Sequence, residues 1–131
     1  MRTRVAIIVA GLGLLLSAGP ALAHHAFAAE YDAKKPIKLT GTVTKLEWLN
    51  PHTWFYIDVK DDNGKVTNWG FEMGSPNILL RAGWTRKSMN PGDVVTVEGS
   101  QAKDGTNNAN VKAVTLASTG QRLFGASSQG Q

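Results

Sequence analysis

The chain has 131 residues, which is enough for one domain and too few for two. Its formal charge is +4 at pH 7, and its Lys and Arg residues are scattered, so a surface that follows nucleic-acid phosphates is not expected. Cysteine is absent, so no disulfide supports the fold, and four Trp, four Phe and two Tyr must supply much of the packing.

Residues 1–23 have the pattern of a secretory signal peptide. Two arginines precede an uncharged apolar run at residues 5–16, and Ala-Leu-Ala at 21–23 is typical of a cleavage site. The apolar run is shorter than the roughly 20 residues that span a bilayer, so we expect no stable membrane anchor after cleavage. The sequence therefore predicts a periplasmic protein that begins at His24, with 108 residues and a formal charge of +2.

A lead segment, residues 24–35, is expected before the first strand, either as a short helix or extended. Phe27 and Tyr31 are spaced to dock it if it is helical. Pro36 is expected to open the first strand, in which apolar residues alternate as far as Val43. Beyond that residue the apolar positions change parity, which predicts a β-bulge or a sharp bend with both faces used.

The second and third strands are predicted at residues 53–60 and 66–72. On the second strand, Phe55 and Ile57 point to one face while Trp54 and Tyr56 point to the other. The strands are joined by Asp61-Asp62-Asn63-Gly64, and an Asn-Gly pair suits the positive φ angles of a hairpin turn.

One short helix is predicted after the third strand. Ser75 suits the N-cap, Pro76 suits the first helical position, and Gly83 is expected to end the helix. The fourth and fifth strands are predicted at residues 93–99 and 110–116. Residues 118–131 are rich in Gly, Ser and Gln and are expected to form a flexible tail.

The order of these elements predicts an all-β fold with one short helix. A long bent first strand, and a helix between the third and fourth strands, favour a small five-stranded OB-like Greek-key barrel at residues 36–117. A generic β-sandwich or meander is the alternative.

Six short motifs resemble a known family over nearly the whole predicted mature chain. They are His24-His25-Ala26-Phe27, Gly41-Thr42-Val43, Trp48-Leu49-Asn50-Pro51-His52, Trp69-Gly70-Phe71-Glu72, Gly83-Trp84, and the run from Gly92 to Gly99. Together they resemble the domain of unknown function 6152 family, which consists of short exported proteins of Gram-negative bacteria. The resemblance implies export and a single small β-rich domain, and it implies no activity.

All three histidines fall within two of these motifs, which suggests a metal site. Cleavage before His24 would leave a free α-amine beside its imidazole, and this pair can chelate one copper ion while His52 completes an N3 set. His25 is an alternative second ligand or an outer hydrogen-bonding partner. Glu72 and Met73 are possible additional contacts, ranked lower because the corner at His52 and the end of the third strand need not be adjacent.

A structural or partner-binding envelope domain is the alternative function. Trp48, Trp54 and Tyr56 would then form an aromatic face for a glycan, a peptide or an envelope protein. The more ordinary interpretation is that these aromatic residues belong to the core. The small charge of the predicted mature protein disfavours a nucleic-acid partner.

Catalytic motifs are not found. The sequence has no cysteine nucleophile, no Gly-x-Ser-x-Gly elbow and no Gly-rich phosphate loop. We therefore predict a binding protein rather than an enzyme, although an open metal site would also allow redox or Lewis-acid chemistry.

Overall fold

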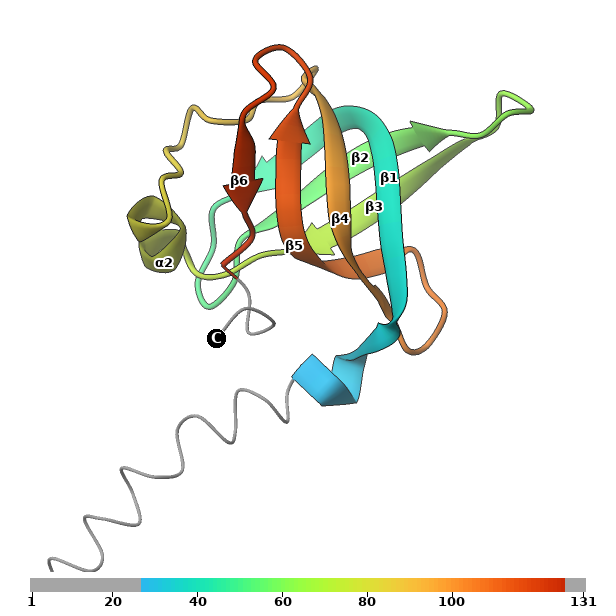
Figure 1. The fold of residues 1–131 in the computed structure, drawn as a ribbon, viewed down its shortest axis with the longest axis horizontal. Coiled ribbons are helices and arrows are strands. Elements are labelled where there is room, and N and C mark those ends of the chain that lie inside the picture. Colours follow the sequence, from blue (N-terminus) through green and yellow to red (C-terminus); the bar gives the residue numbers. More distant parts are fainter. Residues whose placement is uncertain (1–26, 127–131) are drawn as a thin grey trace, which may run out of the picture.

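The computed structural model describes residues 27–126, and this part of the chain is mostly β (Figure 1). A helical turn at residues 27–30 comes first, and helix α2 (Pro76–Arg81) lies between the third and fourth strands. The strands, in chain order, are β1 (Tyr31–Glu47), β2 (Trp54–Lys60), β3 (Val66–Glu72), β4 (Val94–Ala102), β5 (Asn108–Leu116) and β6 (Arg122–Phe124).

The strands form one six-stranded sheet in the order β3-β2-β1-β4-β5-β6. Neighbours in this order pair antiparallel, and β3 also pairs with β5 in parallel. The parallel pairing places Glu72, the last residue of β3, opposite Asn110 of β5. Residues from the two halves of the chain therefore meet at the carboxyl end of β3.

Strand β1 is longer than the sequence pattern predicted. It begins at Tyr31, which pairs with Ala102 of β4, so the prediction that Pro36 opens the strand was wrong. The predicted lead segment is therefore part helical turn and part strand. The predicted bulge is confirmed, because the register with β2 shifts between Val43 and Lys45.

The hairpin between β2 and β3 is confirmed, with a register that runs from Trp54 opposite Glu72 to Lys60 opposite Val66. Its turn is stabilised by the Asp61 carboxylate, which accepts hydrogen bonds from two backbone N–H groups of the turn. Gly64 has φ +83°, a left-handed conformation that favours glycine.

The helix boundaries also follow the predicted signals. The Ser75 side chain accepts a hydrogen bond from the Ile78 N–H, and proline occupies the first turn. The helix ends at Arg81 with Ala82 as its C-cap, and Gly83 follows with φ +99°. Trp84 then packs into the core with 1% of its surface exposed.

The predicted flexible tail contains a sixth strand, so the five-strand expectation was wrong. Strand β6 pairs with β5, and Leu123 at its centre is buried. Past β6, the N–H of Gly125 donates to the Lys112 carbonyl, and the Gly125 carbonyl accepts from the Gly74 N–H. The sheet therefore extends from Tyr31 to Phe124, beyond the predicted domain limits at residues 36–117. The polar composition of this segment gave no sign of a strand, because the strand forms only when Leu123 pairs with Val114 of β5 in the folded sheet.

The core lies between the inward faces of the strands and helix α2. Phe55 of β2 and Phe71 of β3 are fully buried, with ring centroids 5.1 Å apart. Val97 of β4, Val111 of β5 and Leu79 of α2 are also buried in this cluster. The opposite face of β2 and β3 is therefore left for other contacts. Within residues 27–126 no helix is both long and apolar enough to cross a membrane.

Candidate functional site

His52 and Glu72 contact each other at one end of the β2–β3 hairpin. His52 lies in the loop after β1, just beyond the cis Asn50-Pro51 peptide bond, while Glu72 ends β3. The Nδ1 atom of His52 lies 2.5 Å from Glu72 Oε1. The His52 side chain is 50% exposed, whereas the Glu72 side chain is 9% exposed, so a buried carboxylate holds an accessible imidazole. Glu72 was ranked low as a metal contact because it need not lie near His52, but the structure places the two side chains in contact.

Tyr31 is hydrogen-bonded to the second oxygen of the same carboxylate. Its hydroxyl donates a hydrogen bond to Glu72 Oε2 at 2.5 Å, and the tyrosine itself is buried. Burial, together with this hydrogen bond and the carboxylate charge, raises the pKa of Tyr31 far above its ordinary value of 10.0. Phe27 stacks on the Tyr31 ring with centroids 5.7 Å apart. The segment before β1 is therefore attached to the carboxylate that holds His52.

The variant Tyr31→Phe should change the alkaline stability of the protein. Above pH 10.0 an unfolded Tyr31 loses its proton while the folded one keeps it, so the free energy of unfolding falls as pH rises. This contribution is fully present below pH 10.0 and should be missing in the variant. At pH 7 the variant should lose about 1.5–3 kcal/mol, the range for a hydrogen bond to a charged group. Urea unfolding from pH 7 to pH 11 measures both effects. If the free energy of unfolding fell equally steeply with pH above pH 10 in the wild type and in Tyr31→Phe, the prediction would be contradicted.

The proposed aromatic set is divided in the structure. Trp54 and Tyr56, both half-buried on the outer face of β2, stack with ring centroids 6.5 Å apart. Trp48 packs partly against the core, and the Arg86 guanidinium lies 5.9 Å from its ring centroid. Within residues 27–126 no ring contact joins Trp48 to the other two. The face that remains available is therefore formed by Trp54 and Tyr56.

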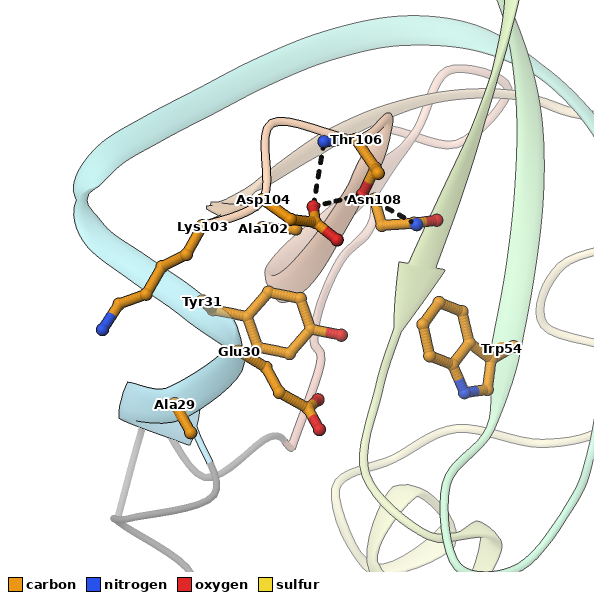
Figure 2. Close-up of a pocket in the computed structure, with 9 residues that line it drawn as sticks. All are labelled: Ala29, Glu30, Tyr31, Trp54, Ala102, Lys103, Asp104, Thr106 and Asn108. Atoms are coloured by element: carbon orange, nitrogen blue, oxygen red, sulfur yellow. Dashed lines mark hydrogen bonds between the residues drawn. The ribbon is translucent and has the colours of Figure 1, made fainter.

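An open cavity of about 570 Å³ lies beside Trp54 (Figure 2). Its walls come from the start of β1, from β2, and from the loop between β4 and β5, which the topology brings to one end of the molecule (Figure 1). The side chains that matter for its chemistry are Glu30, Tyr31, Trp54, Asp104, Thr106 and Asn108. The cavity therefore combines one large aromatic surface with several hydrogen-bonding groups.

The polar wall of this cavity is ordered by its own hydrogen bonds. The Asp104 carboxylate accepts from the N–H of Thr106 at 2.9 Å and from its hydroxyl at 2.6 Å. These bonds lower the pKa of Asp104, so it is charged at neutral pH. The Asn108 amide donates to the Thr106 hydroxyl at 3.1 Å. The β4–β5 loop is thus held by its own side-chain hydrogen bonds and by backbone hydrogen bonds that join Lys103 to Glu30 and Asn107 to Gly70 of β3.

The candidate metal ligands are only partly described by the structure. His24 and His25 lie outside residues 27–126, so their positions relative to His52 are not tested. Within those residues, no group of three or more His, Asp or Glu side chains forms a metal site. Met73 is 1% exposed and packs in the core, while its neighbour Glu72 reaches His52 from the other face of the chain.

Sequence reasoning missed Tyr31 and the β4–β5 loop as parts of the site. Tyr31 was considered only as a docking residue for the lead segment, and nothing local indicates that it contacts a carboxylate 41 residues later. The loop carries Asp104-Gly105, which predicts a turn and gives no sign of a cavity.

The fold and this site define a small, mostly β domain with a histidine held by a carboxylate and an open cavity lined by Tyr31 and Trp54. The chain belongs to the DUF6152 family, a family of unknown function whose model matches residues 12–111. No curated protein sequence matches it.

Two solved structures resemble part of this chain at low sequence identity. One is described as a crystal structure of TiaS in complex with an isoleucine tRNA and ATP, with 21% identity and a TM-score of 0.45 over 65% of this chain. The other, the ZRD-deleted mutant of TiaS in complex with agmatine, has 21% identity and a TM-score of 0.47 over 74% of this chain. The matches span only 18% and 27% of those chains.

Proposed function

We propose that this protein is an exported, periplasmic binding protein that holds a copper-type transition metal on a small OB-like barrel. The signal-like composition of residues 1–23 supports export. The strand pairings support the barrel, because they run from β1 to β2, β3, β5 and β4 and then return to β1. This order, with one parallel pair, is compatible with a five-stranded Greek-key barrel to which β6 is added.

The contact between His52 and Glu72 is the observation that carries the metal proposal. Imidazoles that bind metals usually donate their other ring N–H to a carboxylate or carbonyl, which fixes the tautomer and orients the ring. In this protein the Glu72 carboxylate contacts Nδ1 of His52, so Nε2 is the ring nitrogen that is available for a metal. The side chain is half exposed, so an ion can approach it without opening the core.

The attachment of Tyr31 to Glu72 supports participation of the predicted mature N-terminus. Tyr31 is hydrogen-bonded to the carboxylate that holds His52, and His24 precedes it by seven residues. Because residues 27–30 form a helical turn, this segment spans at most about 17 Å. The α-amine and imidazole of His24 can therefore reach His52, with His25 as an alternative ligand or an outer partner.

Copper titration of the protein that begins at His24 tests this proposal. We expect one Cu(II) per chain, with nitrogen hyperfine structure in the EPR spectrum. Removing a ligand should weaken binding more than the roughly 10–100-fold that follows loss of an outer partner. An additional glycine before His24 and the variant His52→Ala should each have this effect, while far-UV circular dichroism shows an unchanged fold. Weak, non-stoichiometric binding that is insensitive to both changes would exclude the site.

A second candidate function is favoured by the aromatic face on β2. Trp54 and Tyr56 are half-buried rather than enclosed in the core, and Trp54 borders the cavity. This arrangement supports an envelope domain that binds a glycan or a protein partner without a metal.

A further inference from the structure

We propose that the cavity beside Trp54 is a binding site for a saccharide without acidic groups, which stacks on the indole ring. The inference makes the second candidate function specific. It does not depend on a metal at His52, since a different set of side chains would hold the ligand.

The aromatic platform is already positioned for stacking. Trp54 stacks with Tyr56, whose ring is inclined at only 22° to the indole. Tyr31 lies across the cavity from Trp54 (Figure 2). Its hydroxyl is fixed by its hydrogen bond to Glu72. A flat, apolar ring face can therefore enter against Trp54 without rearrangement of the opposite wall.

The polar groups around the platform match the edges of a sugar ring. The Glu30 carboxylate has no hydrogen-bond or ion-pair partner within residues 27–126. Asn108 uses its amide nitrogen on Thr106, and its carbonyl oxygen, which lies over Gly70, accepts no hydrogen bond from these residues. Carboxylate and amide oxygens accept hydrogen bonds from hydroxyl groups. One apolar face and several acceptors at its edge are what a polyhydroxylated ring requires.

The charges of the rim disfavour acidic ligands. Glu30 and Asp104 contribute two carboxylates, and Lys103 contributes one ammonium group. This ammonium donates a hydrogen bond to the Ala28 carbonyl, which is neutral, so its charge is kept and the three side chains together carry a net charge of −1. An acidic sugar or a nucleic-acid phosphate would therefore meet a rim that is negative on balance.

The size of the cavity fits a small saccharide. Ligand pockets in proteins commonly measure about 300–1,000 Å³, and this cavity of about 570 Å³ lies within that range. It is partly open to solvent, so further sugar units of a longer chain can extend outward.

Titration with defined oligosaccharides tests the inference. The probes are cellotetraose, maltotetraose and the trimer of N-acetylglucosamine, with the trimer of galacturonic acid as the acidic counterpart; binding is followed by tryptophan fluorescence and calorimetry. We expect saturable binding of at least one of the first three probes and none of the acidic trimer. Trp54→Ala should weaken binding about tenfold or more, and Asn108→Ala should weaken it several-fold.

Two control variants make the result specific. Trp54→Phe keeps a ring at the platform and should retain more affinity than Trp54→Ala. Phe124→Ala removes an aromatic side chain that is 56% exposed but does not line the cavity, so it should leave binding unchanged. Failure of all three probes to bind, equal binding of the acidic trimer, or undiminished binding by Trp54→Ala would overturn the inference. Copper titration of Trp54→Ala shows separately whether the metal site is present.

Discussion

Replacing Trp84 with alanine should lower the free energy of unfolding by about 3–5 kcal/mol, the range for removing a large buried aromatic side chain. Trp84 is 1% exposed, and its indole N–H donates a hydrogen bond of 2.9 Å to the Phe124 carbonyl. The variant therefore leaves both a cavity and an unpaired carbonyl. Urea unfolding monitored by circular dichroism measures the change.

The variant Trp84→Phe separates these two contributions. Phenylalanine fills most of the volume but cannot donate a hydrogen bond to the Phe124 carbonyl. We therefore expect Trp84→Phe to lower the free energy of unfolding measurably, but by less than Trp84→Ala does. If alanine at this position were tolerated with a loss below about 1 kcal/mol, the packing of the post-helix segment against β6 would be much weaker than the structure indicates.

Replacing Glu72 with alanine should lower stability by about 2 kcal/mol and also weaken copper binding. The stability loss arises because the Tyr31 hydroxyl, which is buried, loses its acceptor. Copper binding weakens because His52 loses the carboxylate that orients its ring. Removing such a partner of a metal ligand typically lowers metal affinity about 10–100-fold. Chemical unfolding and Cu(II) titration of the same preparation measure both.

The conservative variant Glu72→Gln provides the matched control. Its amide can still accept from Tyr31, so it should retain more stability than Glu72→Ala. It lacks the negative charge beside His52, so its copper affinity should remain reduced. Wild-type copper affinity in both variants would show that Glu72 does not position a metal-binding imidazole.

Local sequence determined the features that depend on neighbouring residues. Asn63-Gly64 determined the hairpin turn because glycine readily adopts a positive φ, and Ser75-Pro76 determined where α2 begins. The change of apolar parity after Val43 correctly located the bulge, because side chains alternate along a strand. The same alternation correctly separated the buried Phe55 and Ile57 from the outward Trp54 and Tyr56.

Only the tertiary structure decided which distant residues meet. β1 begins at Tyr31 because Ala102 of β4 pairs with it, and β6 forms because β5 offers it an edge. The hydrogen bonds that define these strands join segments far apart in sequence, so no local pattern contains them. For the same reason the sequence proposed His52 as a ligand without revealing that Glu72 holds it and Tyr31 anchors Glu72. Residue types and spacing determine what chemistry is available, while long-range strand pairing decides which side chains share a site.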